Sequence, residues 1–179
     1  MKHLSRLIAS FLFFLMLSIP YAKAGGLNIF QHSREAPQSK ILHPSGMEYA
    51  LSDFNGDFVL AVFWERSCGP CIKDLKGLNE FSRQAKNKGI RVILISPDSD
   101  WKSWKEHKKF LAKYGAPDVE YFTDPKGKLA GDFGIYTSPH TVLIDENGME
   151  IGRISGRAKW EDNRILDYIA KIKRENADR

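Results

Sequence analysis

The chain has 179 residues, of which 42% are apolar and 27% are charged. This balance excludes collagen-like, low-complexity and wholly disordered chains, and the length suits a single domain. Its 27 Lys and Arg residues outnumber 22 Asp and Glu residues, and the formal net charge of +5 by itself points to an acidic partner such as nucleic acid or lipid headgroups.

Residues 1–24 have the pattern of a secretory signal peptide. They carry three basic residues and no acidic one, an apolar run from Leu7 to Ile19, and small residues at Ala22 and Ala24. At about 1.5 Å per residue the run spans roughly 20 Å, less than the ~30 Å hydrocarbon core of a membrane. We therefore expect cleavage after Ala24, with an uncleaved membrane anchor as the alternative. The remaining chain has 24 basic and 22 acidic residues, a net charge of +2, so most of the excess charge belongs to the export signal.

The rest of the chain divides into a lead-in, a domain and a tail. Residues 25–45 are polar and contain two prolines, so we expect a flexible or loosely docked lead-in. Between residues 46 and 173 apolar runs alternate with helical patterns, which is typical of an α/β domain. Residues 174–179 are expected to form a polar tail.

The elements of the domain are predicted in chain order from their periodicity. The apolar run from Phe58 to Trp64 predicts a strand buried on both faces. A helix over 70–88 and a second buried strand over 91–95 follow it. Asp98-Ser99-Asp100 offers N-cap residues for a helix over 101–114. The remaining predictions are a strand at 119–123, a short helix at 129–133, a hairpin of 141–144 and 151–154 that turns at Asn147-Gly148, and a helix at 160–173.

The only cysteines, Cys68 and Cys71, lie where the first buried strand gives way to a helix. Unpaired N–H groups and the helix dipole favour an anion there, so the Cys68 thiolate forms more easily. Pro70 suits the first helical turn, and Cys71 is close enough to release a mixed disulfide. A structural disulfide, a zinc site and chance are the alternatives. The short loop and the lack of further zinc-ligand motifs make the first two weaker than redox chemistry.

Two segments carry a resemblance to a known family. Phe63 to Cys71 resembles the active-site segment of the thioredoxin superfamily, and Ser138 to Asp145 resembles its cis-proline loop and following strand. Tyr49–Gly56, the helix around Trp104 and Gly156–Trp160 are similar to the TlpA/ResA branch of exported thiol–disulfide oxidoreductases. The resemblance spans residues 45–172. It implies a thioredoxin-like α/β fold, a mixed sheet flanked by helices with one extra helix inserted at 101–114.

The resemblance implies roles for individual residues. Cys68 would be the attacking nucleophile, Cys71 the resolving cysteine and Pro139 the cis-proline beside them. A cis bond before proline costs only about 0.5–1 kcal/mol relative to trans, so a tight turn can hold it; an ordinary trans proline is the alternative. Substrate contacts are expected from four residues, which are Trp64, Gly69, Pro70 and Ser138. The backbone of Ser138 would pair with an extended substrate segment.

Two further side chains are candidates for tuning the cysteines. ResA-like members tend to carry an acid three residues after the second cysteine, and Asp74 stands there, on the helix face of Cys71. A partly buried carboxyl would have a raised pKa and could accept the Cys71 proton, whereas a solvated Asp near the helix start is the alternative. His140 could tune the thiolate or bind a metal, although a histidine that opens a strand is more often packed or solvated.

The expected function is therefore that of a periplasmic thiol–disulfide oxidoreductase that needs no cofactor beyond its cysteine pair. The resemblance implies the reducing direction, electrons from a DsbD-like membrane protein, and protein substrates such as apocytochrome c or a metal-site assembly protein. We expect a monomer that binds no nucleic acid and meets the membrane only through its signal peptide.

Other functions remain open on the sequence. An oxidant or isomerase would use the same cysteines, because the direction depends on a reduction potential that the sequence does not give. A copper-binding metallochaperone would use Cys68, Cys71 and His140. A peroxidase is less favoured because Glu65, rather than threonine, lies three residues before Cys68.

Overall fold

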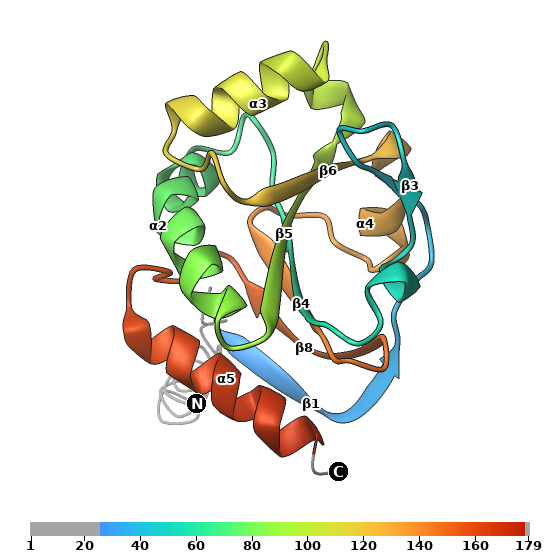
Figure 1. The fold of residues 1–179 in the computed structure, drawn as a ribbon. Helices are drawn as coiled ribbons and strands as arrows, with labels where there is room; N and C mark the ends of the chain where they lie inside the picture. Colours follow the sequence, from blue (N-terminus) through green and yellow to red (C-terminus); the bar gives the residue numbers. More distant parts are fainter. Residues whose placement is uncertain (1–25, 178–179) are drawn as a thin grey trace, which may run out of the picture.

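The computed structural model describes residues 26–177, so the predicted signal peptide and its cleavage after Ala24 lie outside the described residues. The strands (β), helices (α) and short 3-10 helices (η) are, in chain order (Figure 1), β1 (Leu27–Glu35), β2 (Ile41–Leu42), β3 (Glu48–Tyr49), η1 (Leu51–Phe54), β4 (Phe58–Phe63), α2 (Gly69–Lys86), β5 (Ile90–Pro97), η2 (Asp98–Asp100), α3 (Trp104–Lys113), β6 (Glu120–Asp124), η3 (Pro125–Gly127), α4 (Lys128–Asp132), β7 (His140–Ile144), β8 (Met149–Ser155) and α5 (Asn163–Ala177).

One mixed sheet, in the order β1-β8-β7-β4-β5-β6-β2-β3, organises the described chain. The central strands β4, β5 and β6 run parallel, whereas β7 lies antiparallel to β4 and β8 antiparallel to β7. Parallel neighbours need a crossover, and α2 provides the one between β4 and β5. The carboxyl ends of the three parallel strands therefore meet at one end of the sheet. The predicted thioredoxin-like mixed sheet flanked by helices is confirmed.

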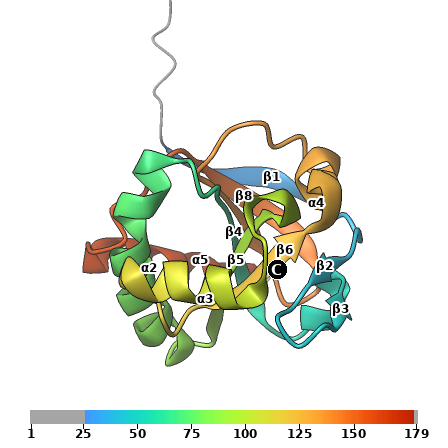
Figure 2. The same ribbon diagram turned by 90° about the horizontal axis from the view of Figure 1, so that it is seen from above.

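Both faces of the sheet are covered, which explains the unbroken apolar run of β4. Leu60 and Val62 belong to the core under α2, α3 and α5, whereas Val59 and Ala61 belong to the core under α4 and η1. Figure 2 shows α2 and α5 on one side of the sheet and α4 on the other. Side chains alternate across a strand, so only a strand buried on both faces needs apolar residues at every position.

Part of the lead-in expected at residues 25–45 forms strands of the sheet, which the sequence did not predict. Its first part is β1, an edge strand paired antiparallel with β8, in which Leu27 lies opposite Ile154. Leu27 and Ile29 pack against the core, but the remaining side chains are mostly exposed. The strand therefore lacks the apolar alternation that marks a buried strand. The later part of the lead-in contains the fully buried Ile41 in β2, which pairs with β3 and β6.

The helices differ from the expected ranges at their ends. The inserted helix α3 starts at Trp104 because the Ser103 side chain caps it, accepting the Glu106 N–H at 3.2 Å. Asp98–Asp100 instead forms η2. α5 begins after Trp160 and continues to Ala177, so most of the expected tail is helical. Within residues 26–177 none of the helices has the length and apolar character needed to cross a membrane.

Candidate active site

The two cysteines form a disulfide at the start of α2. The Cα atoms of Cys68 and Cys71 are 5.2 Å apart, and Cys68 is the N-cap residue of the helix. The backbone N–H of Cys71 points at the Cys68 sulfur, at 3.1 Å. Cys68 is half-buried and Cys71 is only 2% exposed. A partner can therefore reach Cys68, while the second sulfur is covered and the helix N-terminus favours a thiolate at the first.

The turn that precedes β7 lies against this disulfide. The Ser138–Pro139 peptide bond is cis, as the resemblance implies. The Ser138 carbonyl oxygen is 3.6 Å from the Cys68 sulfur, although 70 positions separate the two residues along the chain. The Ser138 hydroxyl donates a hydrogen bond to Glu65 Oε1 at 2.9 Å. Ser138 is half-exposed and Pro139 is buried, so Ser138 is the accessible residue of this turn beside Cys68, and its role in substrate contact stays a prediction.

Asp74 lies one helical turn beyond Cys71 and is buried, with 4% of its surface exposed. Its Oδ1 accepts a hydrogen bond from Arg157 Nε at 2.7 Å, and the Arg157 Nη2 also contacts it. Its Oδ2 is buried without a hydrogen-bond partner in the described chain. Burial raises the pKa of Asp74, and Arg157 opposes that shift only in part. The direction agrees with the expectation of a partly desolvated carboxyl, and its role as proton acceptor stays a prediction.

Arg157 is a site residue that the sequence did not reveal. It follows Gly156, which has a left-handed φ of 77° in the turn after β8. That turn carries the Arg157 side chain, which is 49% exposed, to a carboxyl on α2 that is 83 residues away in the sequence. The similarity of Gly156–Trp160 to the ResA branch pointed to this segment, but nothing local marked the arginine as a partner of Asp74.

Trp64 is corrected from a substrate contact to a core residue. It is only 2% exposed, and its ring lies 5.7 Å from that of Trp101 and 5.9 Å from that of His107. The inserted helix α3 brings His107 and Phe110 against it. Because these aromatic side chains cover its ring, Trp64 supports the loop that leads to Cys68 rather than offering the ring to a substrate.

His107 is a second residue that the sequence did not reveal. Its imidazole is fully buried, neither ring nitrogen has a hydrogen-bond partner within the described chain, and it stacks on Trp101 with centroids 4.0 Å apart. Burial lowers its pKa to about 3. The side chain is thus a neutral part of the aromatic packing that joins α3 to Trp64.

His140 opens β7, directly after the cis-proline turn, and lies opposite Phe63 of β4. It is 9% exposed, and its Nε2 is buried without a partner among the described residues. Burial is the main cause that lowers its pKa, and the charge of Arg153 adds to it. Between residues 26 and 177 no three His, Cys, Asp or Glu side chains gather closely enough to hold a metal ion. The burial of the ring favours the packed interpretation of this side chain.

Comparisons with known proteins agree with the geometry. A family model described as the AhpC/TSA family matches residues 33–149. Thiol-disulfide oxidoreductase ResA of Bacillus thuringiensis subsp. konkukian is 29% identical over 141 residues, which cover 78% of this chain and 77% of that protein. Thiol:disulfide interchange protein DsbE of Xylella fastidiosa is 31% identical over 135 residues, 74% of this chain and 65% of that protein.

A crystal structure of a protein assigned as DsbE from Chlorobium tepidum superposes with a TM-score of 0.65 at 27% identity, covering 81% of this chain and 99% of that one. The solution structure of a thiol:disulfide interchange protein from a Bacteroides species gives a TM-score of 0.65 at 21% identity, over 81% of this chain and 91% of that one. The superpositions confirm the thioredoxin-like fold, and the sequence relatives confirm the ResA-type resemblance.

Proposed function

This chain belongs to the AhpC/TSA family, and from that premise we propose that it is an exported thiol–disulfide oxidoreductase that reduces disulfides in other proteins. One observation carries the proposal: a disulfide at a helix N-terminus, half-exposed at Cys68, whose sulfur is 3.6 Å from the carbonyl oxygen of Ser138. Relatives named ResA and DsbE support the same activity.

The reaction is a dithiol–disulfide exchange. The Cys68 thiolate of the reduced protein attacks one sulfur of the substrate disulfide, forms a mixed disulfide, and releases the other substrate sulfur as a thiolate that takes up a proton. The Cys71 thiolate then attacks the Cys68 sulfur and releases the second substrate thiolate. Two electrons pass to the substrate, and the protein is left with the Cys68–Cys71 disulfide seen in the structure. The cysteine pair supplies the redox chemistry without a cofactor.

Asp74 is the proposed acceptor for the Cys71 proton. Cys71 is covered by protein, so a nearby base is needed to form its thiolate. Asp74 is on the same helix face as Cys71, and its buried Oδ2 has no hydrogen-bond partner within residues 26–177. Burial raises the pKa of this carboxyl, which brings its affinity for a proton closer to that of a thiol.

The setting of the reaction is the finer part of the proposal. The pattern of residues 1–24 supports export to the periplasm with cleavage after Ala24. There the protein would act as a monomer, take electrons from a DsbD-like membrane thiol donor, and reduce apocytochrome c or a metal-site assembly protein. The names of the ResA and DsbE relatives support a thiol-exchange role of this kind.

The direction of transfer is tested by equilibrating the protein with glutathione or dithiothreitol at a series of potentials and counting free thiols. A reductase is expected to have a potential closer to the about −270 mV of thioredoxin than to the about −120 mV of DsbA. The reduced protein should also reduce an exported disulfide protein in a single turnover. A potential near that of DsbA, with oxidation of reduced substrates, would instead establish the oxidant alternative.

The same protein preparation can test the metallochaperone and peroxidase alternatives. Retention of one Cu(I) per chain against a competing chelator, without disulfide reduction, would support the metallochaperone alternative. Consumption of hydrogen peroxide by the reduced protein at a rate above that of free dithiol would support a peroxidase.

A further inference from the structure

A groove opens beside the disulfide at the carboxyl ends of the parallel strands. It has a volume of about 200 Å³ and lies between the ends of β4, β5 and β6 and the loop from Ile135 to Ser138. Ligands of open α/β sheets bind at this edge, where strands end and loops diverge. Because Ser138 lines the groove and its carbonyl oxygen lies 3.6 Å from the Cys68 sulfur, the groove adjoins the reacting centre.

The charged side chains that line this groove are both acids. Asp124 forms part of its wall, but its carboxylate accepts the backbone N–H groups of Leu129 and Ala130 at 2.9 Å each and is nearly fully buried. Glu65 is half-buried, and its Oε1 accepts the Ser138 hydroxyl. No lysine or arginine lines the groove, and Glu65 forms no salt bridge within residues 26–177. A negative charge therefore faces the groove without a cation to balance it.

Arg66, the cationic residue next to Glu65, pairs with another carboxylate. The side chain of Arg66 turns away to Glu106, at 2.7 Å, and to the Asp100 carbonyl oxygen, at 3.1 Å. Its guanidinium also lies over the rings of Trp101 and Phe110. These contacts hold the arginine against α3, so Glu65 is left to meet an incoming group.

An exposed aromatic ring completes the wall of the groove. Tyr136, two residues before Ser138, is 86% exposed, more than the other exposed large hydrophobic residues of the described chain. A ring that lies in solvent offers its face to a cation, because the ring quadrupole attracts positive charge. Tyr136 and Glu65 both line the groove. Glu65 and Tyr136 together thus match a cationic side chain with an apolar stem, such as that of lysine or arginine.

The geometry of strand addition brings such a side chain to the groove. A substrate cysteine bonded to Cys68 lies beside the backbone of Ser138, where an extended segment can pair with the chain. Residues rise by about 3.3 Å along a strand and alternate in direction. A side chain two positions from the substrate cysteine therefore points to the same side of the segment as that cysteine and lies about 7 Å farther along it. Glu65 lines the groove beside Ser138, where such a side chain can be met.

We propose that this groove, named here the Glu65 groove, binds a lysine or arginine side chain that lies two residues from the reacting cysteine in the substrate. The inference rests on the proposed reductase function and narrows its substrates to polypeptides with a basic residue beside the disulfide. Glu65 and Tyr136 are specificity-determining residues, whereas the exchange itself belongs to the cysteines.

The test compares three synthetic peptides with the same intramolecular disulfide that differ at one position two residues from a cysteine. That position holds lysine, norleucine or glutamate, and equilibration with glutathione first establishes that the three potentials agree. The second-order rate of reduction by the reduced protein is measured at low salt. We expect lysine to react faster than norleucine by about fivefold, the effect of a half-exposed charge pair, and glutamate to react more slowly than norleucine.

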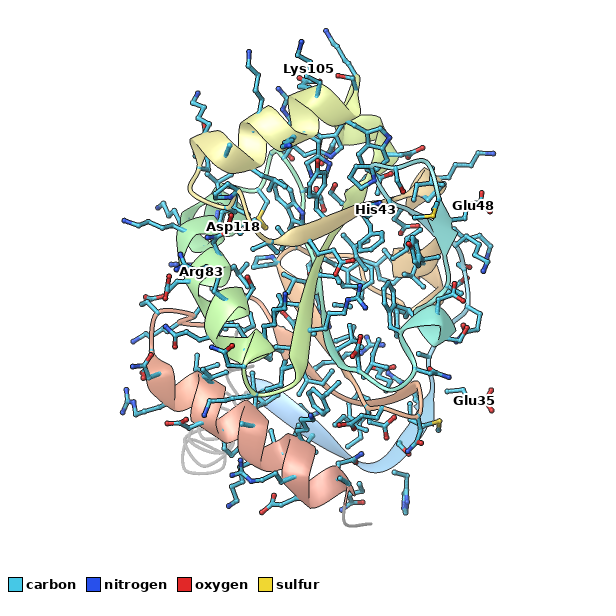
Figure 3. All side chains as sticks on the ribbon, in the orientation of Figure 1. Glu35, His43, Glu48, Arg83, Lys105 and Asp118 are labelled. Carbon is cyan, nitrogen blue, oxygen red and sulfur yellow. A yellow bond between two sulfur atoms is a disulfide. The ribbon has the colours of Figure 1, made fainter. Side chains whose placement is uncertain are left out.

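Variants separate the groove from a general charge effect. Glu65→Gln is expected to bring the ratio of the lysine rate to the norleucine rate close to one, and Tyr136→Ser to lower it in part. The control is Glu35→Gln at the end of β1 (Figure 3). Glu35 is an exposed acid that lies opposite the first residue of β8, and it does not line the groove. This variant should keep the wild-type ratio.

The outcomes distinguish the two proposals. Equal rates for the three peptides with the wild-type protein, or a lysine preference that survives Glu65→Gln, would overturn the groove proposal and leave the reductase function standing. Failure to reduce any of the three peptides would overturn the reductase function, and the groove proposal with it.

Discussion

Two carboxyl groups near the same disulfide lie in different surroundings. Asp74 is buried on α2 and paired with Arg157, whereas the carboxylate of Glu65, half-buried in the loop after β4, accepts only the neutral Ser138 hydroxyl within the described residues. Burial raises the pKa of Asp74, which suits a group that takes up a proton, while an accessible carboxylate without a cation suits a group that attracts one. The same chemical group thus has two proposed roles that its environment separates.

Both proposed roles depend on Cys68 as the attacking sulfur, so replacing Cys68 has the largest expected effect. Cys68→Ser should abolish disulfide reduction, because a serine hydroxyl is not ionised at neutral pH and cannot replace the thiolate. The rate is measured by release of substrate thiols, with thermal unfolding to verify the fold. If Cys68→Ser reduced substrate at the wild-type rate, Cys71 would have to be the attacking sulfur, in conflict with its 2% exposure.

Removal of the buried carboxyl has the next largest effect. Asp74→Asn should slow the release of the mixed disulfide by at least about a hundredfold at neutral pH, the low end of general-base effects. The free energy of unfolding at the same pH should be at least that of the wild type. The folded-state pKa of Asp74 is raised, so its ionisation costs stability as pH rises from its unfolded to its folded pKa. An unchanged rate would remove Asp74 from the mechanism.

Arg157→Gln removes the cation that is paired with Asp74 and that Glu65 lacks. Arg157 lowers the pKa of Asp74 against the effect of burial, so its loss should raise that pKa further. Asp74 must be ionised to accept the Cys71 proton, and it is protonated as the pH falls through its pKa. The acid limb of the pH–rate profile should therefore move to higher pH, with a several-fold loss of rate on the acid side of the profile and little loss on its alkaline plateau.

Arg157→Lys provides the matched control for that profile. A lysine keeps the positive charge but not the two N–H groups that meet Asp74 Oδ1. Its acid limb should lie between those of the wild type and Arg157→Gln. A uniform loss of rate at every pH would show that Arg157 only supports the structure.

The smallest expected effect concerns salt and the exposed carboxylate. Between about 0.01 M and about 1 M salt the Debye length falls from about 30 Å to about 3 Å. The preference of the Glu65 groove for a lysine peptide should decline over this range, whereas the slower resolution caused by Asp74→Asn should change little, because a buried group is screened less. A salt response of equal size at both sites would erase the distinction between them.

The elements that the sequence predicted well are those whose burial is uniform. β4 and β5 are apolar at nearly every position because helices cover both faces of the sheet, and α2 begins at the cysteine motif. β1 was missed because it is an edge strand with mostly exposed side chains. The cap of α3 was misplaced although Ser103 and Glu106 form a readable capping pattern.

Spacing alone predicted the site only where its chemistry is local, and the distant Pro139 was placed by the family resemblance. Cys68, Cys71 and Asp74 lie on one helix, so spacing alone indicates their relation. The contact between Asp74 and Arg157 joins positions 83 residues apart, and that between Glu65 and Ser138 joins positions 73 apart. Such contacts depend on how the loops close over the sheet. Trp64 was misassigned for the same reason, since α3 decides its burial.

The most direct test of the central claim is to trap the mixed disulfide. Cys71→Ser leaves Cys68 free to attack but removes the sulfur that resolves the complex. When the reduced variant is incubated with an oxidised disulfide protein, mass spectrometry should find a covalent complex with the summed mass of both chains, joined through Cys68 and released by dithiothreitol. A folded variant whose Cys68 thiol reacts with an alkylating reagent, yet which forms no such complex, would contradict the account.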